Sequence, residues 1–199
     1  VASDAKKEKK NDECFAETIF PKRPKKIVAK VVRFQNDYDK WVAVVGLINN
    51  RPYEVFTGKL EDAFLLPAWL ESGWVIKNRD DKGESRYDFQ FVDKQGYKVT
   101  LEGLSRTFDK EYWNYAKLIS GVLRHGMPIQ YVVDLINNLN MYDDNINTWK
   151  NGIARTLKQF VEDGTVAADK KCGECGDPEG LIYEEGCLKC KNCGHTKCG

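Results

Sequence analysis

All but one of the seven cysteines lie between Cys172 and Cys198, and their spacing constrains the fold more than any other feature. Four of them form two Cys-x-x-Cys pairs joined by a connection of the length that zinc sites use. Gly176 and Gly194 follow the two pairs, and glycine allows a tight turn whose backbone amides can point at sulfur. We therefore expect a small C-terminal zinc ribbon whose ligands are Cys172, Cys175, Cys190 and Cys193.

The ribbon segment holds few apolar side chains, so its structure should depend on the metal. Structural zinc can supply about 10–16 kcal/mol to peptides of this kind. A second ligand set fits the same pattern with a shorter connection, although Lys191 rather than glycine follows its last cysteine. That set is Cys172, Cys175, Cys187 and Cys190. His195 is a third, weaker candidate ligand.

Either set of four leaves two thiols outside the metal site. The remaining pair is Cys187 and Cys198 with the favoured set, and Cys193 and Cys198 with the other. Cys198 is next to last in the sequence, where a thiol on a mobile segment can reach into a pocket of another protein. This is the geometry of a redox shuttle, and the alternative is a surplus surface cysteine.

The remainder of the chain divides into a charged stretch and an α+β domain. Residues 1–20 mix lysines with acids and lack periodicity, so they should form a flexible linker. From residue 26 onward, β-branched and aromatic runs predict an antiparallel or mixed sheet. Within it, residues 41–48 are nearly all apolar and predict a central strand covered on both faces, and Asn49-Asn50 predicts a hairpin turn. Residues 60–73 fit either a short helix or a covering loop.

Three helices are expected to pack against this sheet, because apolar residues recur at helical spacing after residue 109. Asp109 can cap the first helix, which should end at His125-Gly126. Pro128 suits the first turn of the second, and the third should run from about Ile146 to Asp163-Gly164. We predict an α+β domain over residues 21–164, followed by a zinc-ribbon-like redox tail over residues 165–199.

Several functional classes are disfavoured by composition. No apolar run approaches the roughly 18–20 residues of a membrane span, and the start lacks the pattern of a signal peptide. Because the sequence opens at Val1 rather than Met, we expect it to be part of a longer or processed chain. Cysteine pairs without a signal peptide favour a reducing compartment, so we expect a cytoplasmic protein. The chain has only two histidines and lacks the common nucleotide-binding and hydrolase motifs.

Three segments resemble a known family: "KRPKKIVAKVV…VAVVGLINNRPYEVF", "YWNYAKLISGVLRHGMPIQYVVDLINNL" and "CGECG…GLIYEEGCLKCKNCGHTKCG". Over roughly residues 20–199 the chain is similar to the C-terminal region of adenosylcobalamin-dependent (class II) ribonucleotide reductases. In that family a TSCPD-type accessory domain leads into a cysteine-rich tail. The tail and the motif formed by Arg51, Pro52, Glu54, Val55 and Phe56 carry the resemblance most specifically. This sequence departs from many relatives in having no cysteine around "LNMYDDN".

The resemblance implies part of an oxidoreductase, a ribonucleoside-diphosphate reductase, with a triphosphate substrate left open. Cys198 and Cys187 would form the redox shuttle pair, with Cys193 as the alternative partner. This dithiol would re-reduce the active-site disulfide and then be reduced by a thioredoxin-like protein. Adenosylcobalamin would bind to the catalytic domain of the same enzyme, which has no counterpart here, so this chain is not expected to turn over alone.

A zinc-ribbon module that docks nucleic acid or a protein partner is the alternative function. Ribbons that bind nucleic acid usually present a basic, aromatic surface. The segment from Lys170 onward has equal numbers of acidic and basic residues, and Tyr183 is its only aromatic residue. The sequence therefore disfavours nucleic acid as a partner.

Overall fold

Six antiparallel strands form the main sheet of the computed structural model, which describes residues 20–60, 65–141 and 146–198. Most of the expected linker (residues 1–19) and part of the ambiguous stretch (residues 61–64) lie outside the described residues. The strands are Lys26–Asn36 (β1), Asp39–Ile48 (β2), Arg51–Lys59 (β3), Ser72–Arg79 (β4), Ser85–Val92 (β5) and Lys98–Leu101 (β6). Their order in the sheet is β3-β2-β1-β4-β5-β6. Strands β1–β3 and β4–β6 thus form two meanders, which are joined by the pairing of β1 with β4.

Strand β2 is covered on both faces, as its apolar run predicts. Val42 and Val44 belong to one hydrophobic cluster, while Trp41, Ala43 and Val45 belong to the other. The turn into β3 is also confirmed, because Asn49 and Asn50 both have positive φ angles (51° and 61°). A hairpin turn in that conformation matches the right-handed twist of the two strands that it connects.

In the described residues four helices follow the sheet, one more than expected: Leu104–Thr107 (α1), Lys110–Arg124 (α2), Ile129–Asn137 (α3) and Trp149–Lys158 (α4). The extra helix is the short α1. The Asp109 side chain caps α2 by accepting from two backbone amides, and His125 ends that helix, as predicted. Helix α4 is shorter than expected at both ends, because Thr148 caps it and a turn follows Lys158.

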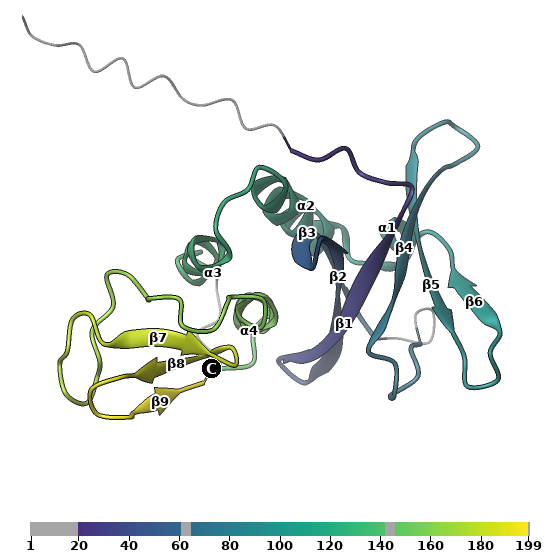
Figure 1. Cartoon of the computed structure of the whole chain (residues 1–199). Coiled ribbons are helices and arrows are strands. Elements are labelled where there is room, and N and C mark those ends of the chain that lie inside the picture. The colour runs from purple at the N-terminus through teal and green to yellow at the C-terminus, as the bar shows by residue number, and fades with distance from the viewer. Residues whose placement is uncertain (1–19, 61–64, 142–145, 199) are drawn as a thin grey trace, which may run out of the picture.

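Two cores lie on opposite faces of the sheet. Helices α2, α3 and α4 cover one face, as Figure 1 shows. On the other face the sheet curves, so that the Phe56 ring of β3 lies 5.1 Å from the Tyr87 ring of β5. The described part of the ambiguous stretch has no helix, and Leu66 and Leu70 pack into this second core as a covering loop.

The "RPYEVF" segment fastens β3 to the end of α2. Arg51 donates to the carbonyl oxygen of Leu123 in the last turn of α2 (2.9 Å) and to that of Met127 just beyond the helix (2.6 Å). The backbone amide of Val55 donates to Ser120 Oγ in the same helix (2.9 Å). The motif thus fixes the sheet against its longest helix.

The C-terminal segment forms a second, three-stranded antiparallel sheet of Leu181–Glu184 (β7), Cys187–Cys190 (β8) and Thr196–Lys197 (β9). Figure 1 places this sheet beside α3 and α4. Leu181 and Tyr183 are buried in the same cluster as Ile153 and Leu157 of α4. The ribbon therefore shares a core with the helical layer instead of standing apart from it. None of the helices in the described residues is long and apolar enough to cross a bilayer.

Candidate metal centre and neighbouring disulfide

Four cysteine sulfurs converge at one end of the small sheet. All four lie within 4.8 Å of one another, with 3.6 Å between the sulfurs of Cys172 and Cys193 and the same distance between those of Cys175 and Cys190. Cys172 and Cys190 are buried, whereas Cys175 and Cys193 are exposed. These are the four residues of the favoured sequence-based ligand set.

Each pair sits in a knuckle turn closed by its glycine. The amide of Gly176 donates to the Cys172 carbonyl, and the amide of Gly194 donates to the Cys190 carbonyl, each at 2.9 Å. Both glycines have positive φ angles (72° and 75°), a conformation that costs little without a β-carbon. The amide of His195 completes the second turn by pointing at Cys193 sulfur.

The thiols differ in acidity because their surroundings differ. Backbone amides of Cys175 and Glu174 donate to Cys172 sulfur and, against the cost of burial, lower its pKa to about 6. At Cys193 the His195 amide favours the thiolate, but desolvation and the neighbouring thiols prevail and raise the pKa to about 12. Four thiolates this close need a cation among them. A tetrahedral set of four sulfurs suits zinc or iron, and the residues therefore fit a structural metal ion.

The other two tail cysteines form a disulfide. Cys187 opens β8 and is joined to Cys198, which follows β9, with 4.5 Å between their Cα atoms. The antiparallel register pairs Leu188 with Lys197, which places the two cysteines opposite each other. Cys198 is exposed and Cys187 is half-buried. The disulfide is thus open to solvent on the Cys198 side.

The alternative ligand assignments differ from this geometry. Cys187 lies in the disulfide and outside the group of four, while Cys193 lies inside that group. The His195 ring is also outside it, with Nδ1 4.0 Å from a Glu174 carboxylate oxygen. The bound metal and the redox role of the disulfide stay predictions.

Two features of the structure were missed by sequence reasoning. A buried carboxylate, Glu54, sits between Arg23 and Arg124, and its signal in the sequence is one acid in an otherwise uncharged strand interior. A cavity of about 420 Å³ lies between α2 and the β4–β5 hairpin. Its lining residues are scattered along the chain, so they leave no local motif.

Comparison with known proteins identifies the domain that precedes the tail. No curated protein and no solved structure matches the chain significantly. Residues 27–162 match the family described as the NrdJ homologue C-terminal domain. NrdJ is the adenosylcobalamin-dependent ribonucleotide reductase, so the match relates the chain to the C-terminal region of that enzyme. Since the matched region spans more than half of the sequence, the chain belongs to the NrdJ homologue C-terminal domain family.

Proposed function

We propose that this chain is the C-terminal redox region of an adenosylcobalamin-dependent ribonucleotide reductase. In this proposal the dithiol of Cys187 and Cys198 re-reduces a disulfide that the catalytic part forms each time a ribonucleotide is reduced. The observation that carries the proposal is the separation of the six tail cysteines into a group of four and an exposed disulfide. The pair is therefore available for exchange without loss of a metal ligand.

The exchange moves two electrons through two sulfur–sulfur bonds. The Cys198 thiolate attacks one sulfur of the active-site disulfide, which forms a mixed disulfide and releases one active-site thiolate. The Cys187 thiolate then attacks Cys198 sulfur, releases the second active-site thiolate and leaves the Cys187–Cys198 disulfide. A thioredoxin-like dithiol returns that disulfide to two thiols by the same chemistry. Protons from solvent convert the released thiolates to thiols.

The four-cysteine centre has a structural role in this proposal. Zinc bound by Cys172, Cys175, Cys190 and Cys193 would hold β8 in place and keep those sulfurs out of thiol exchange. Zinc has no redox chemistry of its own, which suits a centre next to an exchanging disulfide. Adenosylcobalamin would belong to the catalytic part and would supply the radical that starts nucleotide reduction.

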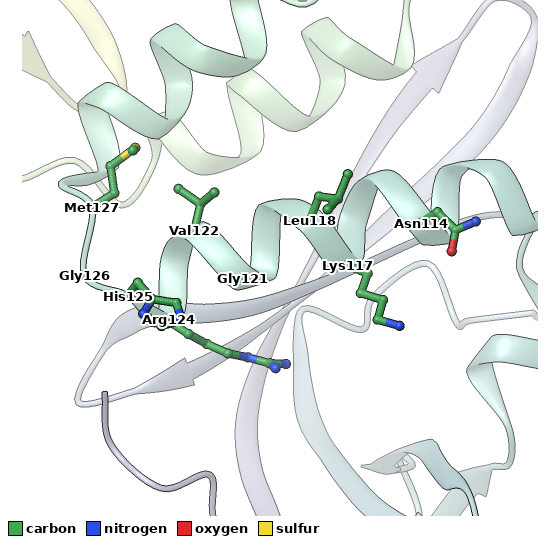
Figure 2. Close-up of a pocket in the computed structure, with 9 residues that line it drawn as sticks. All are labelled: Asn114, Lys117, Leu118, Gly121, Val122, Arg124, His125, Gly126 and Met127. Atoms are coloured by element: carbon green, nitrogen blue, oxygen red, sulfur yellow. The ribbon is translucent and has the colours of Figure 1, made fainter. Parts of the chain in front are cut away.

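The α+β domain would connect the tail to the catalytic part, and we assign it to the TSCPD-type accessory domain. Its surface supports such a contact. Leu118, Val122 and Met127 line an open apolar groove along α2, and Figure 2 places Leu118 and Val122 on the side of α2 opposite Lys117 and Arg124. Exposed apolar surface of this kind is typical of protein–protein contacts. A cytoplasmic location would supply the reducing partner that the cycle needs.

The exchange can be tested on this chain. The oxidised, zinc-loaded protein is mixed with thioredoxin, thioredoxin reductase and NADPH, and NADPH consumption is recorded. We expect one NADPH per chain, because thioredoxin, at about −270 mV, can reduce an exposed disulfide. Cys198→Ser should remove this consumption, while Cys14→Ser, which changes a cysteine far from the tail in sequence, should leave it intact. Equal consumption by both variants would overturn the shuttle assignment.

The same substitution separates the two routes of electrons in the complete reductase. Cys198→Ser should abolish turnover driven by thioredoxin but retain turnover driven by a small dithiol, which can enter the active site directly. Full thioredoxin-driven turnover in the variant would leave the tail with a structural role only. Substitution of Cys187 by serine should abolish thioredoxin-driven turnover in the same way as Cys198→Ser. Substitution of Cys193 by serine should in addition release zinc.

A further inference from the structure

The cavity between α2 and the β4–β5 hairpin combines aromatic and cationic walls. Its volume of about 420 Å³ falls within the range of small-molecule sites. Phe56, Tyr87 and Trp113 form one wall, with ring centroids 5.1–6.3 Å apart. Lys117 and Arg124 contribute the positive charge, and none of these residues belongs to the metal centre or the disulfide.

Both cations reach the cavity from one helix. Lys117 and Arg124 are two turns apart in α2, which places them on the same side of the helix. Figure 2 shows both side chains leaving that side, away from Leu118 and Val122. Within the described residues, no hydrogen-bond or salt-bridge partner faces Lys117 Nζ. Its charge is therefore available to a ligand.

Arg124 supplies the second cation of the cavity, and Glu54 holds its guanidinium in place. Its Nε–H is buried and lacks an acceptor among the described residues, although Arg124 Nη2 lies 3.3 Å from a Glu54 oxygen. Because that Nε has almost no solvent-accessible surface, a ligand would meet the positive charge of the Arg124 guanidinium and not this donor. The Glu54 carboxylate also pairs with Arg23, so one buried negative charge faces two guanidinium groups. Among the residues that line the cavity, Lys117 and Arg124 outweigh Glu84 by one positive charge, which an anion can balance.

We propose that this cavity binds a nucleoside monophosphate, with the phosphate between Lys117 and Arg124 and the base against Tyr87 and Trp113. Phosphate suits paired cationic donors, and a flat ring suits an aromatic wall. Glu84 lines the same cavity and can accept hydrogen bonds from sugar hydroxyl groups. The site is independent of the redox function proposed above.

Calorimetric titration of the whole chain with adenosine 5′-monophosphate tests the site. We expect saturable binding with a Kd below about 1 mM, and weaker binding of adenosine or inorganic phosphate alone. Lys117→Gln should weaken binding about tenfold, since it removes one charged donor. Lys110→Gln is the matched control, because Lys110 is exposed on the same helix but does not line the cavity.

Three results would overturn the proposal. The first is no binding of the nucleotide at millimolar concentration, and the second is equal weakening by the two lysine substitutions. The third is inorganic phosphate binding as tightly as the nucleotide, because the aromatic wall would then contribute nothing. Lys117 is exposed, so its substitution should leave the fold intact, and a circular-dichroism spectrum of each variant checks this point.

Discussion

Arg23 and Glu54 form a two-point ion pair in the interior, with Nε–Oε2 at 2.9 Å and Nη2–Oε1 at 2.6 Å. The Glu54 side chain is fully buried and that of Arg23 is 8% exposed. The arginine precedes β1, whereas the glutamate lies in the middle of β3. This pair therefore ties the entry of the domain to its far sheet edge. Gly46 leaves room for it, because a β-carbon there would lie 2.7 Å from Glu54 Cγ.

Removing the Glu54 carboxylate should lower the unfolding free energy substantially. Glu54→Gln leaves two guanidinium groups without their counter-charge in a buried place, and we expect a loss of about 3 kcal/mol in unfolding free energy. Asp39→Asn is the control, because its pair with Lys59 is largely exposed and should contribute at most about 0.5 kcal/mol. Urea denaturation measures both. Similar losses in the two variants would contradict the structural role of the buried pair.

Tyr183 tests whether the ribbon shares its core with the helices. The side chain is 1% exposed and packs in the cluster that contains Leu157. Tyr183→Ala should lower the unfolding free energy by about 3–4 kcal/mol, in the range of large-to-small core changes. Tyr38→Ala, at a fully exposed position, should change it by less than about 0.5 kcal/mol. A single unfolding transition that shifts in the first variant alone is the expected result.

Metal content distinguishes the two groups of cysteines. We expect about one zinc per chain by elemental analysis of protein prepared under reducing conditions. Cys190→Ser should remove it, while Cys198→Ser should retain it. Chelation should melt the knuckle turns around Gly176 and Gly194 but leave β1–β6 folded, which hydrogen exchange can resolve. Equal zinc loss in both serine variants would argue against this division of the cysteines.

The pKa of Asp88 leads to a prediction of how the stability of the fold depends on pH. Burial disfavours its charge, but hydrogen bonds from Gly103, Asn78 and Arg86 outweigh this effect and hold its pKa below the usual 3.8. Its carboxylate therefore stabilises the fold above the unfolded-state pKa, and the contribution is lost as pH falls through the lower folded-state value.

The prediction is a pH-dependent difference between the natural chain and Asp88→Asn. At neutral pH we expect the variant to be less stable by about 2 kcal/mol, as for a buried charged hydrogen-bond acceptor. The difference should stay constant down to about pH 5 and shrink below about pH 4. Denaturation curves at four pH values measure it. A difference that grows with acid would contradict the assigned hydrogen bonds.

Periodicity predicted the sheet well, because β2 is apolar at every position that must be buried and its turn carries two asparagines. It failed at α1, whose four residues are too few for a periodic signal and whose cap, Gly103, offers no side chain. It also overestimated α4. Phe160 and Val161 continue the apolar pattern and pack against the core, although the helix has already ended at Lys158.

The candidate site was only partly predictable from spacing. Both possible ligand sets contain two Cys-x-x-Cys pairs, and the glycine after each pair favoured the set that the structure brings together without excluding the other. The pairing of β8 with β9 places Cys198 opposite Cys187, and a strand register depends on the folded chain rather than on adjacent residues. The cavity beside α2 escaped detection for a similar reason, because Trp113 and Tyr87 come from segments far apart in sequence.

The placement of Cys198 after the second knuckle sets a limit on distance. Once the disulfide opens, the last metal-site residue before it is Cys193, five positions earlier in the chain. An extended segment of that length spans at most about 17 Å. In the proposed shuttle, the knuckle thus fixes the length of the tether, and a catalytic pocket served by Cys198 would have to open within that radius of the ribbon. Longer travel would have to come from movement of the whole domain.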